Sequence, residues 1–191
     1  MKTYLLLILF GSLTLYTAPA QEATFAIPVI NPGFETDVQT CPAEPCYAAG
    51  ITGWMVGPVS GTFRPGPLQY PIGIPGGLNV GAIGNFSSTG SIMQTTGVTL
   101  RADTTYVLKL SIGQRLDYPF TGYAVSLMAG GVVLASDSSL QPAPGTFLTD
   151  TIVYKTGPHP PLAGLPLQII VTSVGTGEVD VDKVSLTATV N

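Results

Sequence analysis

The stretch Tyr-Val-Leu-Lys-Leu-Ser-Ile at 106–112 decides the fold class. It puts Tyr, Leu, Leu and Ile on one side of an extended chain and shorter or charged residues on the other. Successive side chains of a β-strand point to opposite faces. Tyr-Ala-Val-Ser-Leu at 123–127 repeats the same alternation. This pattern is typical of a sheet with one face buried against a second sheet.

On both sides of 106–112, short apolar runs alternate with clusters of Gly and Pro, and no stretch shows sustained helical periodicity. Gly130 and Gly131 sit where a tight hairpin needs positive φ. The stretch 57–77 is expected to be a long loop. The sequence therefore predicts an all-β fold, a two-sheet antiparallel jelly-roll sandwich. The expected strands are 24–30, 51–56, 78–83, 91–96, 105–112, 122–128, 132–136, 146–154, 167–173 and 178–187.

The first residues are typical of an export signal. Lys2 precedes an apolar run at 4–10, and Ala-Pro-Ala at 18–20 supplies the small residues of a cleavage site. We therefore predict a signal peptide at 1–20, a single domain at 21–191, and a secreted or periplasmic protein without a membrane span in its mature form. The net charge of −4 argues against nucleic acid or an anionic membrane as a partner.

Cys41 and Cys46 are the only two cysteines. In an oxidising compartment a pair so closely spaced is expected to form a disulfide that shapes a small loop. A redox or metal-binding pair is the alternative, but no His or further Cys lies nearby in the sequence.

Two carboxylates are candidates for a calcium site. Glu35 follows the first expected strand at a Pro-Gly turn, and Asp182 lies on the last. A jelly roll brings these strands together, and Ca²⁺ binds six to eight oxygens, which carboxylates and turn carbonyls can supply. The alternative is that both are ordinary surface acids.

Glu178, Asp180 and Asp182 alternate along the last expected strand, so they share one face. Three carboxylates in a row repel one another, which predicts either a shared cation or at least one raised pKa. A solvated strand face is the alternative.

Aromatic residues in and beside loops are candidates for ligand contact, because rings can stack on a sugar or enclose an indole. Core packing is the alternative for each ring, and Trp54 in particular is expected in the core. The candidate ligand-binding residues are Tyr70, Arg115, Tyr118, Phe120 and Tyr123.

Several segments resemble known families. Ile-Asn-Pro-Gly-Phe-Glu at 30–35, Gly53-Trp54, and Val-Asp-Lys-Val-Ser-Leu at 181–186 resemble galactose-binding-like carbohydrate-binding modules. Within that superfold, Pro-Gly-Gly-Leu-Asn-Val-Gly at 75–81 and the segment 127–135 resemble the Stig cyclases.

The Stig cyclases are exported, calcium-dependent enzymes that rearrange and cyclise indole–isonitrile terpenoids. The resemblance implies the same pairing of Glu35 and Asp182 on calcium. It also implies that an aspartate of the last strand is the acid that promotes the rearrangement, with Asp180 the nearest equivalent and Asp182 the alternative, and that Tyr70 lines the pocket.

Three functions remain open from the sequence. The leading one is an exported, calcium-stabilised ligand-binding module of carbohydrate-binding type. The alternatives are a Stig-cyclase-like enzyme and a structural protein without a small ligand, so whether the chain is an enzyme stays undecided. The expected partner is a small molecule or a glycan, and the sequence is compatible with a homo-oligomer.

Overall fold

The computed structural model describes residues 22–41 and 43–191. The predicted signal peptide at 1–20 lies outside these residues. Within them, no helix is long and apolar enough to cross a membrane.

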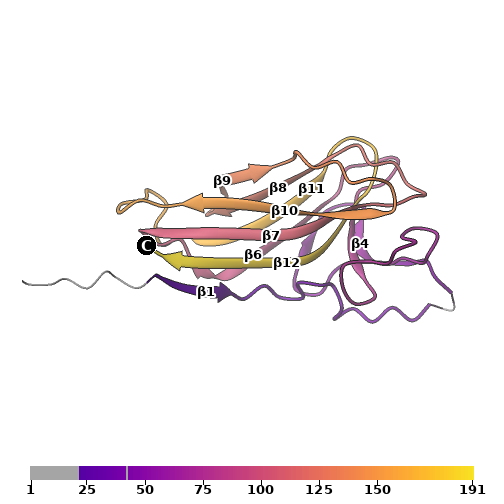
Figure 1. The fold of residues 1–191 in the computed structure, drawn as a ribbon, viewed down its shortest axis with the longest axis horizontal. Helices are drawn as coiled ribbons and strands as arrows, with labels where there is room; N and C mark the ends of the chain where they lie inside the picture. Colours follow the sequence, from indigo (N-terminus) through magenta and orange to yellow (C-terminus); the bar gives the residue numbers. More distant parts are fainter. Residues whose placement is uncertain (1–21, 42) are drawn as a thin grey trace, which may run out of the picture.

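The described chain forms two antiparallel sheets that lie as separate layers (Figure 1). The small sheet has the order β3-β6-β11-β8-β9. Its strands are β3 (Met55–Val56), β6 (Ser91–Thr99), β8 (Tyr123–Ala129), β9 (Val132–Asp137) and β11 (Pro166–Ser173).

The large sheet has the order β10-β7-β12-β5-β4-β2, and β1, which lies off this path, pairs with the opposite end of β12 from β5. Its strands are β1 (Ala23–Ile27), β2 (Cys46–Ala49), β4 (Ser60–Arg64), β5 (Val80–Ile83), β7 (Thr104–Gln114), β10 (Thr146–Lys155) and β12 (Val179–Val190). The predicted jelly-roll sandwich is confirmed.

The main core fills the space between the two sheets. The alternation at 106–112 is confirmed, because Tyr106, Leu108, Leu110 and Ile112 are all at most 1% exposed. Trp54 is buried in the same core, as expected. Burial of alternate side chains from both layers is what drives the two sheets together.

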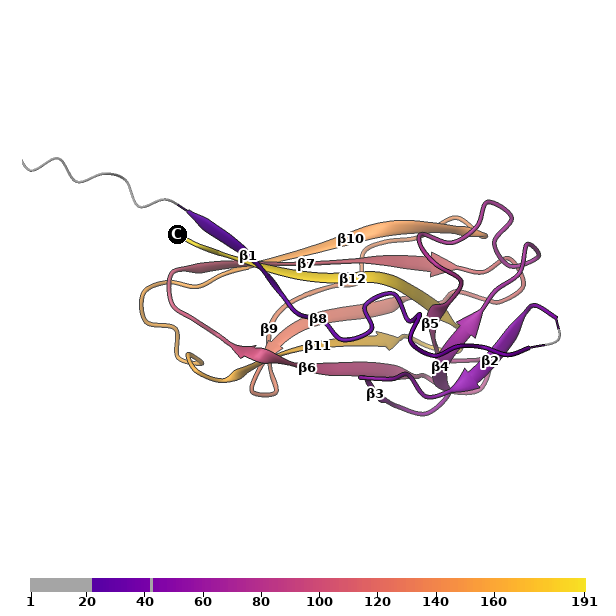
Figure 2. The ribbon, with the colours of Figure 1, turned by 90° about the horizontal axis from the view of Figure 1, so that it is seen from below.

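The first and last strands lie side by side, as the calcium prediction requires. β1 pairs antiparallel with the C-terminal half of β12, from Ala23 opposite Val190 to Ile27 opposite Leu186. Figure 2 shows this pairing at one end of the sandwich, with β2, β4 and β5 at the other end.

The expectation of a long loop at 57–77 is wrong in part. Ser60–Arg64 forms β4, which pairs with β5 and with β2, a second strand that the sequence pattern did not reveal. Neither strand alternates between apolar and polar residues. Both add to the large sheet at the end where the candidate site lies.

A second, smaller apolar cluster covers the outer face of the large sheet. Phe63, Val80 and Ala82 are buried there, with Ile74 and Phe147 packed against them. The segment 65–78, which follows β4, folds back over this face. Side chains on the outer face of the sheet are thus buried as well.

Candidate functional site

Three acids at the start of β12, counting the residue directly before it, lie on the covered outer face of the large sheet. Val179 and Val181 belong to the main core, so the alternate residues Glu178, Asp180 and Asp182 point the opposite way. Asp180 and Asp182 are nevertheless only 1% and 0% exposed. The prediction of one shared face is confirmed, and the alternative of a solvated face is wrong.

Asp180 is held by a tyrosine from the segment that covers it. The Tyr70 hydroxyl donates a hydrogen bond of 2.6 Å to Asp180 Oδ2, while Asp180 Oδ1 has no partner. The Tyr70 ring packs on Phe147, with ring centroids 4.6 Å apart. Gly113 makes this possible, because a Cβ there would lie 2.3 Å from the Phe147 ring.

Burial sets the protonation of this pair. It raises the pKa of Asp180 well above its usual value, and the negative charge of Glu178 adds to the effect. Burial and the charge of Asp180 likewise raise the pKa of Tyr70, so the hydroxyl keeps its proton. Asp180 is therefore a carboxyl that stays protonated where an exposed aspartate would not.

Arg115 ties the neighbouring acid to the loop that follows β7. Its Nη1 is 2.7 Å from Glu178 Oε1, and its Nε and Nη2 each donate to Asp117 at 2.9 Å. Burial raises the pKa of Glu178, against the opposing effect of Arg115. Gln69 Nε2 donates to Asp117 at 2.8 Å, which links this network to the segment that carries Tyr70.

An aromatic cavity of about 390 Å³ opens beside the network. We use this name for the space bounded by Tyr47, Phe63, Tyr118, Arg115 and Glu178, with Pro45, Cys46, Val59, Gly84 and Asn85 completing the lining. The Arg115 guanidinium lies over Phe63 and Tyr118, at 4.2 and 4.9 Å from the ring centroids. The cavity thus combines apolar rings with one ion pair.

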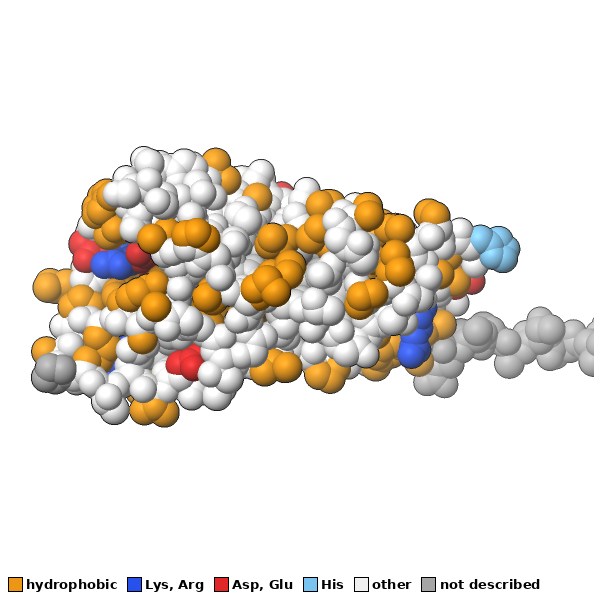
Figure 3. All heavy atoms as spheres, turned by 180° about the vertical axis from the view of Figure 1, so that it is seen from behind, with side chains coloured by type: hydrophobic (Ala, Val, Ile, Leu, Met, Phe, Trp, Pro, Cys, Tyr) orange, Lys and Arg blue, Asp and Glu red, His pale blue; other side chains and the backbone are white. Residues whose placement is uncertain are grey.

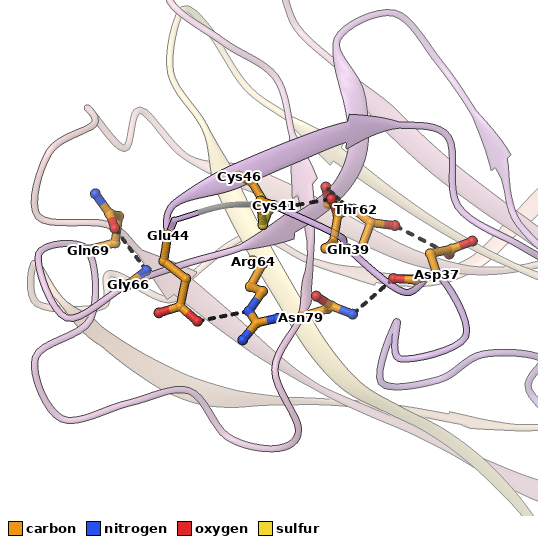
Figure 4. The surroundings of a disulfide bond; sticks show 10 residues. All are labelled: Asp37, Gln39, Cys41, Glu44, Cys46, Thr62, Arg64, Gly66, Gln69 and Asn79. Atoms are coloured by element: carbon orange, nitrogen blue, oxygen red, sulfur yellow. Dashed lines mark hydrogen bonds and ion pairs between the residues drawn. A yellow bond between two sulfur atoms is a disulfide. The ribbon is translucent and has the colours of Figure 1, made fainter.

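The disulfide borders this cavity, because Cys46 is one of the lining residues. Cys41 and Cys46 are bonded, as predicted, and Cys46 pairs with Arg64 across β2 and β4. Figure 4 shows the disulfide between the Glu44–Arg64 pair and Gln39. The bridge therefore fixes the edge strand that presents Tyr47.

A second hollow lies further along β12. Glu35 and Asp182 both line it, and a Cβ built on Gly33 would be 3.6 Å from Asp182 Oδ1 and 4.0 Å from Glu35 Cγ. Asp182 Oδ2 is buried without a hydrogen-bond partner. Burial, with a contribution from Glu35, raises the pKa of Asp182 to about 7.

These residues fit a cation. Two carboxylates meet in one hollow, and one buried oxygen lacks a donor, which a hard cation such as Ca²⁺ would satisfy. In the part of the chain that the structure describes, no group of three or more His, Cys, Asp or Glu side chains could hold a metal. Backbone carbonyls or water would complete the ligand set.

Not every predicted ligand-binding residue reaches the aromatic cavity. Arg115 and Tyr118 line it, and Tyr70 lies against Asp180 behind it. Tyr123 is instead buried in the main core, where its hydroxyl contacts Asp150 and Asp137. Phe120 packs against that core, 6.3 Å from the Tyr123 ring. Phe120 and Tyr123, both predicted to bind the ligand, therefore do not line this cavity.

Sequence reasoning also missed several lining residues. Tyr47 and Phe63 lie on β2 and β4, the two strands that were not predicted. Glu178 was noticed only as a member of the acid series. Its pairing with Arg115 joins residues 63 positions apart, and no local pattern signals it.

The family model HpiC1-like, described as HpiC1 cyclase, matches residues 25–187. The chain belongs to this cyclase family. The structure of a Stig cyclase, Fisc from Fischerella sp. TAU, has 30% sequence identity and a TM-score of 0.77, with 87% of this chain and 98% of that chain covered. It was solved with (3Z)-3-(1-methyl-2-pyrrolidinylidene)-3H-indole.

Two further structures separate the cyclase from the carbohydrate-binding interpretation. A cyclase from Fischerella sp. TAU in complex with 4-(1H-indol-3-yl)butan-2-one is 29% identical, with a TM-score of 0.73 over 86% of this chain and 97% of that chain. The module TmCBM61, solved with β-1,4-galactotriose, is only 15% identical, with a TM-score of 0.56 over 84% and 97%. The second likeness shows the fold alone, so the cyclase alternative is better supported than the leading carbohydrate-binding interpretation. No curated protein matches the sequence.

Proposed function

We propose that this protein is a cyclase that rearranges an indole-bearing substrate in the aromatic cavity, with Asp180 as the acid. Membership of the HpiC1-like family supports this. The single observation that carries it is the buried Asp180 carboxyl, which accepts the Tyr70 hydroxyl at 2.6 Å. A general acid needs a pKa near the working pH, and burial moves an aspartate in that direction.

The proton would travel along β12 to the cavity. The Glu178 carboxyl neighbours that of Asp180 and lines the aromatic cavity. A proton leaving Asp180 can therefore reach the bound substrate through Glu178. Protonation of the substrate draws electron density away from the reacting carbon, so that carbon is attacked more readily and the ring closes. The proton that the cyclised product then loses restores the acid.

The aromatic walls suit such a reaction. Tyr47, Phe63 and Tyr118 offer apolar contact that excludes water and holds a planar ring system. Ring faces also stabilise positive charge that develops on a substrate. The acid and the rings thus have separate roles, one in proton transfer and the other in binding and orientation.

Conversion of an indole–isonitrile terpenoid tests the activity. The wild-type protein should give a cyclised isomer of unchanged mass, detected by liquid chromatography and mass spectrometry. Asp180→Asn should lower turnover by about 10²–10⁴-fold, the usual contribution of a general acid. Asp103→Asn, at an exposed turn before β7, is the matched control. Equal turnover by both variants would exclude Asp180 as the acid.

We also propose that Glu35 and Asp182 hold calcium and that the protein is exported. A bound Ca²⁺ would neutralise the two carboxylates and join the segment after β1 to β12. It binds only the folded state, so it should raise the melting temperature. Removal with a chelator should lower the melting temperature, and added Ca²⁺ should restore it. An unchanged melting temperature would refute the calcium site. Export predicts a mature N-terminus at Gln21, which mass spectrometry of the secreted protein would reveal.

A further inference from the structure

Tyr118 lines the aromatic cavity but has few anchors of its own. It lies in the loop between β7 and β8, and its ring belongs to neither apolar cluster of the fold. Within residues 22–41 and 43–191, its hydroxyl takes part in one hydrogen bond, a long one of 3.4 Å that it accepts from the backbone N–H of Phe86. The position of this ring therefore depends on the loops around it.

The side chain of Phe86 gives Tyr118 a second contact. The two rings pack together, with centroids 3.9 Å apart and an angle of 35° between their planes. The Arg115 guanidinium contacts the same Tyr118 ring at 4.9 Å and the Phe63 ring at 4.2 Å. A continuous row of contacts thus leads from Phe63 on β4, through the cavity wall, to Phe86.

The turn that carries Phe86 is fixed by its own hydrogen bonds. Asn85 Oδ1 accepts the backbone N–H groups of Ser87 and Ser88 at 2.8 and 2.9 Å, an arrangement by which asparagine closes a turn. The backbone N–H of Asn85 donates to Ser88 O, and its carbonyl accepts the Gly177 N–H, both at 3.0 Å. The last bond ties the turn to the segment that leads into β12. The backbone of Phe86 therefore has a set place relative to the cavity.

Core packing does not account for the side chain of Phe86. It is 59% exposed and belongs to neither apolar cluster. Exposed hydrophobic side chains are scattered over the face shown in Figure 3, so exposure alone does not distinguish it. What distinguishes Phe86 is its contact with a ring that lines the cavity. Removal of the Phe86 ring should therefore change the stability of the fold little, but it should free Tyr118 to move.

We propose that Phe86 is a positioning residue, which holds the Tyr118 ring in the wall of the aromatic cavity. This role rests on the proposed function, because it concerns how the same cavity binds an indole. A side chain that becomes ordered only when a ligand binds lowers the affinity for that ligand. Contact with Phe86 orders Tyr118 before the ligand arrives, so Phe86 raises the affinity without touching the ligand.

Binding of 4-(1H-indol-3-yl)butan-2-one, measured by isothermal titration calorimetry, tests this role. Phe86→Ala should raise the dissociation constant about two- to tenfold, the range expected when one side chain must be ordered by the ligand. Phe86→Tyr keeps the ring and should bind as the wild-type protein does. The melting temperature of Phe86→Ala should change little, because surface substitutions rarely alter stability much.

Val132→Ala is the control for the removal of an exposed apolar side chain. Val132 is 50% exposed and pairs with Ala129, the last residue of β8, whereas the loop with Tyr118 precedes the first. About 20 Å of strand therefore separates Val132 from that loop. Val132→Ala should change neither the affinity for the ketone nor the melting temperature.

A double variant shows whether Phe86 acts through Tyr118. Tyr118→Ala should itself weaken binding of the ketone. Adding Phe86→Ala should then have no further effect, because the ring that Phe86 positions is gone. Two residues that act through one contact give such non-additive changes in free energy.

The outcomes separate this role from the proposed function. If Phe86→Ala binds the ketone as tightly as wild type, or weakens binding equally without the Tyr118 ring, Phe86 does not position Tyr118 and the indole site stands. A large fall in melting temperature, or misfolding, would also overturn the role, because Phe86 would then support the fold. If the wild-type protein does not bind the ketone, both the indole site and the role of Phe86 fail.

Discussion

The hydrogen bond between Tyr70 and Asp180 offers the sharpest test of the buried site. Tyr70→Phe removes one oxygen and leaves the ring on Phe147. The lost bond is 2.6 Å long and buried, and Asp180 Oδ1 has no other partner. Leaving a buried polar group without its hydrogen-bond partner costs about 1–3 kcal/mol.

We expect Tyr70→Phe to lower the free energy of unfolding by about 2 kcal/mol, roughly a 30-fold change in the folding equilibrium. At this chain length each kcal/mol shifts the melting temperature by about 2–4 °C, so the expected drop is about 4–8 °C. Urea denaturation measures the free energy. The slope of the transition should not change, because the surface exposed on unfolding stays the same.

Tyr47→Phe is the matched control for this experiment. It removes the same atom from a tyrosine that is 49% exposed at the rim of the aromatic cavity. An exposed hydroxyl contributes little, so its effect should stay within about 0.5 kcal/mol. Equal stability of the two variants would refute the claim that the hydroxyl of Tyr70 satisfies a buried carboxyl.

Three other changes probe the surroundings of the site. Arg115→Met should destabilise the fold by about 3 kcal/mol, because it leaves a buried acid unpaired. Arg64→Met breaks a more exposed ion pair and should cost at most about 1 kcal/mol. Urea denaturation of both variants measures the two losses. Gly77→Ala should weaken Ca²⁺ binding measured by calorimetry, since its Cβ would lie 2.2 Å from Glu35 Oε1. Burial raises the pKa of Asp150 in the folded state, so the folded protein holds this proton to a higher pH than the unfolded chain does. The wild-type protein therefore loses stability as the pH rises above about 4. Asp150→Asn has no such proton to lose and should become more stable relative to wild type over the same range.

Each of these three predictions can be contradicted by a specific result. Equal losses for the two arginine variants would mean that burial of the ion pair does not matter. Gly73 has φ of 83° and nothing within 4 Å of its Cβ position, so Gly73→Ala reports backbone strain alone. If Gly77→Ala weakens Ca²⁺ binding no more than Gly73→Ala does, Glu35 is not a ligand. A pH-independent difference between Asp150→Asn and wild type would exclude a raised pKa in the folded state.

The sandwich was predictable because its strands carry the periodicity that burial imposes. β8 alternates strictly between more and less buried residues, β7 does so from Thr104 to Leu110, and each has a neighbouring strand on both sides. β2 and β4 were not predicted because their surroundings do not impose this periodicity. β2 is an exposed edge strand, and β4 is buried on both faces because the segment 65–78 covers it. Neither environment requires alternation.

The candidate site was only partly predictable for a related reason. Alternation on β12 placed Glu178, Asp180 and Asp182 on one face, but it could not tell whether water or protein covers that face. The answer depends on where the segment with Tyr70 folds. That segment is fixed by turn hydrogen bonds such as Tyr70 N to Gly66 O and by contacts to residues distant in sequence. Long-range contacts of this kind leave no local pattern.

The three acids of β12 show how a sandwich fold can acquire chemistry on one strand. The Cα atoms of residues two apart on a strand are about 7 Å apart, so each carboxyl has its own main partner, although those of Glu178 and Asp180 remain neighbours. Glu178 meets Arg115, Asp180 meets Tyr70, and Asp182 lies in the hollow with Glu35. The strand itself stays fixed, because Val179 and Val181 anchor its other side in the core. Three acids with different surroundings can therefore arise from substitutions on one face, while the packing that holds the two sheets together is unchanged.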